Sequence, residues 1–536
     1  MNKYLKISIL ALISLIISNN LLSQVTVKEY YIEKQYLNFP VDMKQDRQTV
    51  NFISEDDTLT YSLIRLGDGN FDYWVFKDVS ALKGKRLKLT FSNPVKGIEM
   101  IYQSDKFAGQ DSLYQESKRP QFHFTSRRGW NNDPNGLVYF DGEYHLFYQH
   151  NPFETKWGNM HWGHAAGTDL LHWTEFNDVL YPDKLGTMFS GSAIIDEKNT
   201  AGWGKNTMVV VYTSDNNGRE VQCLAYSTDK GGTFTKYSGN PVAGETRDPK
   251  VFWYEPNQEW VMALYKIGGI SIFTSKNLKM WKEEDHVNGF YECPELFELS
   301  VDNNPNQKLW VLYGASGTYM LGDFDGKKYT PRFGKYRTNY GAHYAAQTYN
   351  NTPDGKRIQI SWGQIEQPNM PFNQMMLFPA ELTLRTTNEG IRLFSEPIEA
   401  IAKLHEKEYD FSDLSLSDAN EKLKTIKSNL LHIKARLESL NGSGISIDYK
   451  GNNYVTIDAD GINGIQTPLE NPASLIFDIE ILIDITSIET FYQSGQIVIA
   501  EGLEAATKET GLEIFGDVHN IRIHNLKVYE LRSIWK

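Results

Sequence analysis

Three acidic residues of this chain stand in short segments whose other residues restrict the backbone. Asp133 lies in Trp-Asn-Asn-Asp-Pro-Asn-Gly, Asp248 in Arg-Asp-Pro and Glu292 in Glu-Cys-Pro. Each segment holds a proline, which fixes its own φ angle and so the local direction of the chain. The first segment has the composition of a turn, because turns favour Asn, Asp, Pro and Gly. Carboxylates held in this way suit glycoside hydrolysis, in which one acts as nucleophile and another as acid and base.

Each segment alone is explained more simply, by a surface turn or, for Arg247 and Asp248, by a local ion pair. The three segments nevertheless occur together, and Phe-Ser-Gly-Ser-Ala at 189–193 accompanies them. Together they resemble the motifs of glycoside hydrolase family 32, which includes invertases, inulinases and levanases. The family motif is Trp, one variable residue, then Asn-Asp-Pro-Asn-Gly. Asn131 occupies the variable position, where many members have methionine, and this leaves the carboxylate unchanged.

The resemblance implies a role for each acidic residue. Asp133 corresponds to the nucleophile of a retaining mechanism, Glu292 to its acid/base, and Asp248 to the carboxylate that binds ring hydroxyls and stabilises the transition state. Such a mechanism needs no cofactor and no metal. Four histidines could suggest a metal site, but they lack the spacing of ligands on one element: His150, His161, His164 and His172.

Further residues correspond to family positions around the sugar. Taken alone, each aromatic residue among them would be assigned to core packing, and only the motif match favours contact with a ligand. Arg247 would hold its neighbours and keep carboxylates ionised. The expected substrate-binding residues are Asn132, Gln149, Trp157, Phe189, Ser190, Arg247 and Trp362.

A repeat of about fifty residues runs through the middle of the chain, which is typical of propeller blades. Apolar strands begin near Tyr144, Met208, Trp260, Trp310 and Ile358. We therefore predict an all-β fold in which residues 117–402 form a five-bladed β-propeller, in agreement with the family. Each acidic segment falls at the start of a blade, so the three carboxylates are expected to meet at one mouth of the central channel.

The flanks of the predicted propeller also have the pattern of strands. Residues 25–116 contain alternating runs such as Leu87–Phe91, which predict an N-terminal β-sandwich-like module resembling one found in some bacterial members of the family. Residues 403–536 contain strand-like runs at Asn453–Ile457 and Leu475–Leu482, which predict a C-terminal β-sandwich. Neither flank shows a set of converging polar residues.

The first 24 residues have the pattern of a secretory signal peptide. Lys3 and Lys6 precede an apolar run from Ile7 to Ile17, which is too short to span a bilayer. No cysteine precedes Cys223, so a lipidated cysteine cannot end this segment. We expect a secreted or periplasmic protein without a membrane span.

Composition excludes several other classes. The net charge of −13 makes nucleic acid an unfavourable partner, whereas a neutral sugar polymer causes no electrostatic conflict. Two cysteines, Cys223 and Cys293, do not make a disulfide framework, and Cys293 is interpreted as a small buried residue.

The resemblance to the family implies removal of terminal β-fructofuranosyl residues from fructans and sucrose-type sugars. The alternatives are an endo-levanase or a fructosyltransferase with the same residues, and a fructan-binding protein on an inactive scaffold. A propeller glycosidase acting on arabinose or xylose chains is a further alternative, although its motifs differ. Retention of Asp133, Asp248 and Glu292 argues against the binding protein, because a like-charge cluster is costly without catalysis. Linkage preference and oligomeric state are left open.

Overall fold

The computed structural model describes residues 26–535 except positions 56, 245, 441, 467–474 and 510. Strands dominate, and within these residues the single α-helix is α2 (Leu416–Leu423), so the predicted all-β class is confirmed. The segment expected to be a signal peptide, residues 1–24, lies outside the described residues. In the described part of the chain, no helix has the length and apolar character needed to cross a membrane. Short 3₁₀ turns lie at Ser80–Leu82, Ile98–Met100, Gln110–Ser112, Glu255–Asn257 and Glu399–Leu404.

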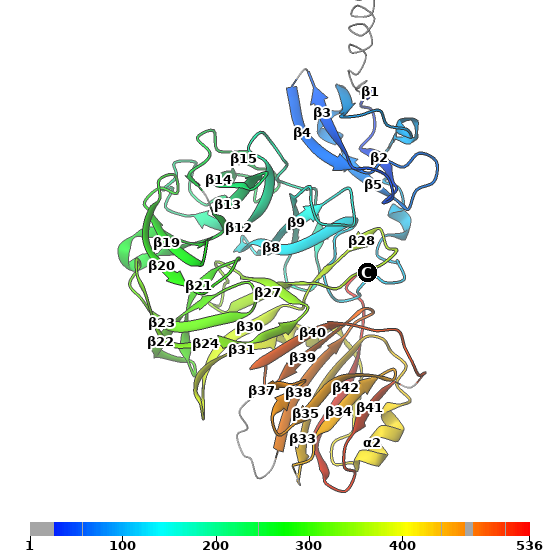
Figure 1. The fold of residues 1–536 in the computed structure, drawn as a ribbon, viewed down its shortest axis with the longest axis vertical. Coiled ribbons are helices and arrows are strands. Elements are labelled where there is room, and N and C mark those ends of the chain that lie inside the picture. The colour runs from blue at the N-terminus through cyan, green and yellow to red at the C-terminus, as the bar shows by residue number, and fades with distance from the viewer. Residues whose placement is uncertain are drawn as a thin grey trace, which may run out of the picture. The chain divides into compact units, whose positions relative to one another are not determined.

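One compact unit comprises the described residues up to Asp111 together with Pro152–Glu154. Its strands form two antiparallel sheets, in the orders β1-β6-β3-β4 and β5-β2-β7, coloured blue in Figure 1. The predicted run at Leu87–Phe91 lies in β6, where buried and more exposed residues alternate. The strands are β1 (Thr26–Tyr31), β2 (Tyr36–Val41), β3 (Gln48–Ser54), β4 (Asp57–Ile64), β5 (Tyr73–Asp78), β6 (Arg86–Phe91) and β7 (Tyr102–Ser104).

The segment Pro152–Glu154 completes the core of this unit. The Phe153 ring is 1% exposed and lies 5.6 Å from the ring of Phe39 and 6.3 Å from that of Phe52. The buried Glu154 carboxylate is paired with Arg47. Nothing in the sequence indicated that a segment from the first predicted blade belongs to this core.

The second compact unit comprises residues 112–151 and 155 onward. It contains a five-bladed propeller, whose first three blades are separate sheets of mainly antiparallel strands and whose last two share one nine-stranded sheet through β21 and β30. The strands predicted near Tyr144, Met208, Trp260, Trp310 and Ile358 are present as β9, β13, β18, β22 and β27.

The first blade contains β8 (Gly129–Phe140), β9 (Glu143–Asn151), β10 (His161–Gly167), β11 (Thr174–Glu175) and β28 (Phe372–Asn373). The second contains β12 (Thr187–Asp196), β13 (Thr207–Asn216), β14 (Arg219–Ser227), β15 (Thr235–Lys236) and β16 (Ala243–Gly244). The third contains β17 (Arg247–Tyr254), β18 (Glu259–Lys266), β19 (Gly269–Ser275) and β20 (Lys282–Asn288). The shared sheet contains β21 (Glu295–Val301), β22 (Asn304–Tyr313), β23 (Thr318–Phe324), β24 (Tyr329–Arg337), β26 (His343–Thr348), β27 (Arg357–Gly363), β29 (Met375–Met376), β30 (Ala380–Thr387) and β31 (Gly390–Pro397).

The first strand of each blade lies nearest the centre of the propeller, as Figure 1 shows for β8, β12 and β21. The inner strands β8, β12 and β17 pack in succession, and β26 closes the ring against β8. The acidic segments stand at or just before the first residues of β8, β17 and β21. The predicted convergence of these segments therefore follows from the direction shared by the inner strands.

The segment around Asp133 corrects one expectation. It is part of strand β8 and not a turn. The register of β8 against β9 shifts between Asn131 and Pro134 and again between Asn135 and Val138. Proline and glycine occur in strands at such irregular positions, because there the ladder needs no hydrogen bond from that residue.

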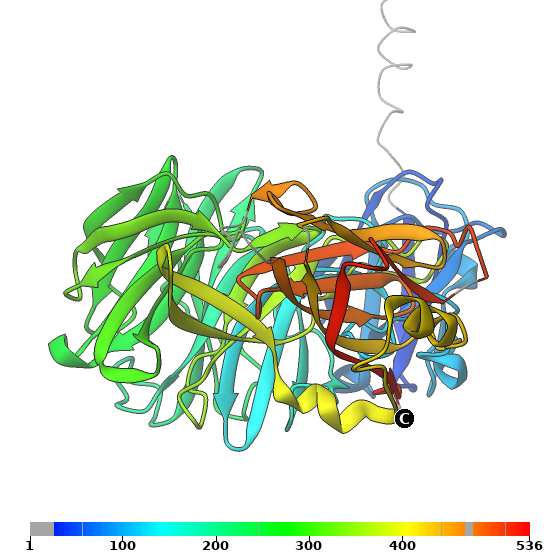
Figure 2. The same cartoon turned by 90° about the horizontal axis from the view of Figure 1, so that it is seen from below.

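The C-terminal residues form two further sheets within the second unit, whose orange and red strands are seen from below in Figure 2. One has the order β25-β40-β39-β38-β33-β42-β32 and the other β37-β36-β35-β34-β41. The strands are β25 (Asn339–Gly341), β32 (His405–Asp410), β33 (Leu431–Ser439), β34 (Ile445–Tyr449), β35 (Asn452–Asp458), β36 (Gly461–Ile462), β37 (Ile465–Gln466), β38 (Leu475–Ile483), β39 (Ser487–Tyr492), β40 (Ile497–Gly502), β41 (Leu512–Phe515) and β42 (Ile521–Leu531).

A buried histidine joins these sheets to the start of the propeller. The His123 Nδ1 lies 2.8 Å from Asp484 and its Nε2 lies 2.6 Å from Glu489. Burial alone would lower the pKa of His123, but the two carboxylates raise it to about 9. The imidazole is therefore charged at neutral pH and is held by ion pairs at both nitrogens.

Candidate active site

One pocket of about 240 Å³ gathers the residues that the motifs singled out. All ten predicted site residues line it, and two residues that were not predicted to contact the substrate, Cys293 and Tyr344, complete the lining. The ten are Asn132, Asp133, Gln149, Trp157, Phe189, Ser190, Arg247, Asp248, Glu292 and Trp362.

Asp133 lies in β8 with hydrogen-bond donors around its carboxylate. The Ser190 hydroxyl donates to Oδ2 at 2.5 Å, and the Asn132 amide donates to Oδ1 at 3.0 Å. Asn132 is itself fixed by the indole N–H of Trp130, 2.9 Å from its side-chain oxygen. The motif tryptophan thus positions the amide that donates to Asp133. Three aligned donors, counting the Cys293 thiol at 3.6 Å, favour the ionised carboxylate that a nucleophile requires.

Asp248 is more deeply buried and has fewer donors. It is 6% exposed, and its Oδ2 accepts a hydrogen bond from the backbone N–H of Cys293 at 3.1 Å. Burial, reinforced by the negative charge of Asp133, raises the pKa of Asp248 to about 8. Burial also raises the pKa of Asp133, although its donors oppose this shift. Near neutral pH the pair therefore retains a proton, and the poorer donor set of Asp248 favours that residue as its site.

Glu292 has a different environment from the two aspartates. The Arg247 Nη2 lies 2.6 Å from its Oε1, and the Tyr344 hydroxyl donates to its Oε2 at 2.7 Å. Arg247 also pairs with Glu220 at 2.8 Å, which fixes the guanidinium between two carboxylates. One carboxyl oxygen thus faces a cation and the other a neutral hydroxyl, so Glu292 is oriented whether or not it carries a proton.

The backbone at these positions is strained. The φ angles of Asp248, Glu292 and Cys293 are +64°, +47° and +41°, a left-handed region that residues with a Cβ rarely adopt. Ala345 and Gln374, beside the pocket, have φ angles of +49° and +70°. Such conformations persist where the surrounding structure holds them, and they concentrate at functional sites.

Cys293 and Tyr344 extend the predicted set. Cys293 is buried, as expected, but its thiol also lies between two carboxylates, 3.6 Å from Asp133 and 3.7 Å from Asp248. Its place in Glu-Cys-Pro was the only signal for this contact. Tyr344 stands in no motif that we identified. It reaches Glu292 from β26 at a register shift between Tyr344 and Gln347, which the sequence did not reveal.

Aromatic side chains form the rim of the pocket. Trp157 is 54% exposed and its ring lies 5.9 Å from that of Phe189 in an edge-to-face arrangement. Trp362 packs 6.0 Å from Trp130, and its indole N–H donates to Gln374 at 3.0 Å. The exposed ring of Trp157 is available to a ligand, whereas Trp362 is held in place by its neighbours.

The four histidines considered as metal ligands have other partners. His150 bonds to Asp178 at 2.6 Å, and His161 bonds to the Asn159 carbonyl at 2.7 Å. Among the residues described, no group of three His, Cys, Asp or Glu side chains is arranged to hold a metal ion.

Deeper along the inner strands, a buried polar layer crosses the channel. The Lys250 ammonium lies 3.1 Å from Glu295 and donates to the Thr348 carbonyl at 2.6 Å. The Thr348 hydroxyl donates to the same glutamate at 2.5 Å. The three residues are buried, and this Lys250–Glu295–Thr348 layer links β17, β21 and β26 below the residues that line the pocket.

Replacement of Asp248 by Asn is expected to stabilise the fold with a defined pH dependence. The folded-state pKa of about 8 lies above the ordinary value of 3.8, so the stability that comes from holding the proton is lost as pH rises from about 4 to about 8. Asn has no proton to lose, and it adopts left-handed φ angles readily. The Tm difference between variant and wild type should therefore grow from pH 4 to pH 8 and level off above it. Calorimetry across this pH range measures the Tm difference, and a difference that stays constant with pH contradicts the prediction.

Known proteins resemble this chain in sequence and in fold. The sequence model described as glycosyl hydrolases family 32 N-terminal domain matches residues 123–397. A levanase from Bacillus subtilis is 36% identical over 500 residues, which cover 82% of this chain and 74% of the levanase. The range matched by the family model, residues 123–397, includes the positions of all ten predicted site residues.

Two solved structures have the same fold. An exo-inulinase from Aspergillus awamori gives a TM-score of 0.67 at 25% identity, with 79% of this chain and 100% of that chain covered. A fructofuranosidase from Schwanniomyces occidentalis, in complex with fructosylnystose, gives a TM-score of 0.69 at 26% identity, with 78% of this chain and 99% of that chain covered.

Proposed function

Because the chain belongs to glycoside hydrolase family 32, we propose that it is a retaining β-fructofuranosidase that releases terminal fructose from fructans and sucrose-type oligosaccharides. The observation that carries this proposal is the single pocket lined by Asp133, Asp248 and Glu292 together with the seven expected binding residues. The names of the similar proteins, a levanase, an exo-inulinase and a fructofuranosidase, support a fructosyl substrate.

The first half of the reaction forms a covalent ester. The Asp133 carboxylate attacks the anomeric C2 of the terminal fructosyl unit while Glu292 gives its proton to the glycosidic oxygen. The C2–O bond breaks, and the remaining sugar leaves with the proton. Ser190 and Asn132 donate to the attacking carboxylate, which favours its ionised form and orients it.

The second half hydrolyses that ester. Esterified Asp133 carries no charge, and Glu292, now a carboxylate, takes a proton from water whose oxygen attacks C2. The ester bond breaks, Asp133 regains its negative charge and Glu292 its proton. Arg247 and Tyr344, which contact Glu292 at 2.6 and 2.7 Å, suit this alternation, since each binds a different oxygen of the carboxyl group.

In this proposal Asp248 binds the sugar and takes no part in the proton transfers. Its buried carboxyl group accepts hydrogen bonds from ring hydroxyls, which become stronger donors as positive charge develops on the ring. Gln149 contributes further polar contacts, and Trp157 and Phe189 cover the apolar face of the sugar. Catalysis is assigned to the propeller, residues 117–402, while the flanking sandwiches at 25–116 and 403–536 receive no catalytic role.

The size of the pocket supports exo-action. Its volume of about 240 Å³ lies below the range of about 300–1,000 Å³ that is typical of sites for larger ligands, which suits one monosaccharide unit. Trp157 and Phe189 lie at the rim, where they would enclose a chain end. An endo-levanase or a fructosyltransferase would use the same carboxylates with a more open cleft or a second sugar as acceptor.

The order in which products appear tests exo-action. Purified protein is incubated separately with sucrose, inulin and levan, and early products are separated by chromatography. Free fructose should be the first product from each substrate. Levanbiose or longer oligosaccharides before fructose would replace exo-action by endo-action, and new, longer oligosaccharides would indicate transfer.

Secretion forms part of this proposal. The expected signal segment at residues 1–24 implies export, and a similar protein from Aspergillus awamori that is named an extracellular exo-inulinase supports it. A polymer such as levan must meet its hydrolase outside the inner membrane, in the periplasm or the medium. Fractionation of cells that express the full chain tests this, with activity expected outside the cytoplasm.

A further inference from the structure

A second cavity, of about 560 Å³, lies at the other end of the inner strands. It is lined by the last residues of β12 and β17 and by Leu296–Glu298 of β21, whereas the carboxylates stand at or before the first residues of β17 and β21. Phe252 follows Asp248 by four residues, which is about 13 Å along a strand. The Lys250–Glu295–Thr348 layer lies between these two positions. The second cavity is therefore separate from the catalytic pocket.

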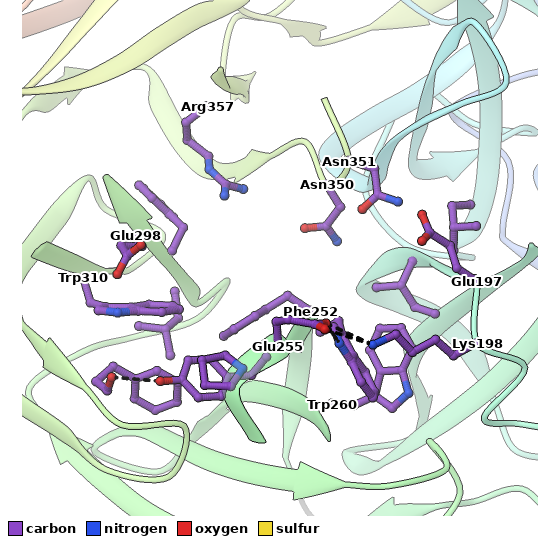
Figure 3. Close-up of a pocket in the computed structure, with 18 residues that line it drawn as sticks. Glu197, Lys198, Phe252, Glu255, Trp260, Glu298, Trp310, Asn350, Asn351 and Arg357 are labelled. Atoms are coloured by element: carbon purple, nitrogen blue, oxygen red, sulfur yellow. Dashed lines mark hydrogen bonds and ion pairs between the residues drawn. The ribbon is translucent and has the colours of Figure 1, made fainter. Parts of the chain in front are cut away.

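The cavity has one aromatic wall and one polar wall. Figure 3 shows Phe252, Trp260 and Trp310 on one side of it, with Asn350 and Arg357 facing them across an open space. Phe252 and Trp310 are only partly buried, and their ring centroids are 5.7 Å apart. Ring faces on one side and hydrogen-bonding groups on the other match a pyranose or furanose ring, which has apolar faces and a polar edge.

Several polar atoms of this lining have no partner among the described residues. Arg357 donates through Nη1 to Thr348 and to the Tyr349 carbonyl, which leaves Nη2 and Nε without an acceptor. Asn350 donates through its amide nitrogen to two backbone carbonyls, of Ala193 and Val251, and nothing described donates to its side-chain oxygen. These donors and acceptors are held in place and are free to bind hydroxyl groups.

The charges around the cavity favour a neutral ligand. Lys198 pairs with Glu255 at 3.0 Å, and Glu298 pairs with Lys308 at 2.9 Å. Three glutamates line the cavity against one lysine and one arginine, so an anion would meet net negative charge. A cation would have to displace existing ion pairs. A polyhydroxylated neutral molecule requires neither.

We propose that this cavity is a second carbohydrate site, which binds a short segment of a neutral oligosaccharide chain without cleaving it. That the sugar is a fructan rests on the proposed function. The volume lies within the range for ligands larger than one monosaccharide. Such a site would keep the enzyme on its polymer while the catalytic pocket, at the other end of the propeller, takes chain ends.

Calorimetric titration with an inulin-type tetrasaccharide tests the proposal. The protein carries Asp133→Asn so that the sugar is bound and not consumed. We expect two sites in this protein. Adding Trp310→Ala should weaken the second site by about tenfold or more, because a stacking ring is lost, while the first keeps its affinity. Adding Trp157→Ala instead should weaken the first site and spare the second.

Two further variants distinguish loss of the second site from misfolding of the protein. Glu298→Arg changes an exposed position and places a long side chain beside the Trp310 ring, so it should block the second site without removing core packing. Trp310→Phe keeps a ring at this position and should retain most of the binding.

The outcomes separate the two proposals. One site in the Asp133→Asn protein, lost with Trp157→Ala and unaffected by Trp310→Ala and Glu298→Arg, would overturn the second site. Two sites that both persist in Trp310→Ala and Glu298→Arg would also overturn it. A site that depends on Trp310 with none that depends on Trp157 would support the cavity and reject the proposed function.

Discussion

Asp133→Asn is expected to lower kcat on sucrose and on fructans by about 10⁴-fold or more, because the covalent path loses its nucleophile. The amide has nearly the same shape as the carboxylate and can still contact Ser190 and Asn132. The fold and the affinity for sugar should therefore be retained. Initial rates on sucrose, combined with a binding titration, measure both quantities.

The control and the chemical rescue make this prediction specific. Asp141→Asn, at a half-exposed position with a φ angle of +50° that Asn tolerates, should leave the rate unchanged. In Asp133→Ala, added azide should restore cleavage of an activated aryl fructoside and give a fructosyl azide of inverted configuration. Substantial hydrolysis by Asp133→Asn, or azide products of retained configuration, would remove Asp133 from the nucleophile role.

Glu292→Gln is expected to have an effect that depends on the leaving group. Glutamine cannot donate a proton to the glycosidic oxygen, so hydrolysis of sucrose and levan should fall by about 10²–10⁴-fold. An aryl fructoside with an acidic phenol needs no such proton, so the ester should form at a rate close to that of wild type. Its slow hydrolysis should then produce a burst of phenol, which stopped-flow absorbance records.

The matched control for this variant is Glu408→Gln, which lies in β32 of the C-terminal sheets and pairs with Lys527 at the surface. It should behave as wild type with every substrate. Equal losses on sucrose and on the aryl fructoside in Glu292→Gln would contradict the acid/base assignment. Azide should accelerate the second step and give a product of retained configuration, opposite to that from Asp133→Ala.

The sequence predicted that the three carboxylates share one pocket because they stand at corresponding places in a repeat, whereas the other pocket residues were predicted from the family resemblance. Asp133, Asp248 and Glu292 are more than a hundred residues apart at the extremes, yet each precedes or opens an inner strand. Once blades of about fifty residues are recognised, the common direction of these strands brings the three residues to one end of the channel. This step required only the repeat length and the position of each motif.

The contacts that the sequence did not predict depend on local departures from regular strands. Tyr344 reaches Glu292 at a register shift in β26, and Asp133 itself lies at a shift in β8 where a turn was expected. Side-chain direction alternates along a regular strand, so a single extra residue reverses it, and the sequence does not show where this happens. The sequence also did not predict that Phe153 packs in the N-terminal core, because an apolar residue in a loop does not indicate what it packs against.

The Lys250–Glu295–Thr348 layer has a kinetic consequence. Since this buried layer lies below the carboxylates, in the proposed mechanism we expect water to reach the fructosyl ester through the same opening by which the first product leaves. Any sugar that returns to this opening then competes with water for the ester. At high sugar concentration we expect part of the fructosyl groups to pass to a sugar hydroxyl, and free fructose to compete with fresh substrate. The ratio of hydrolysis to transfer thus depends on how water and sugar compete at one opening.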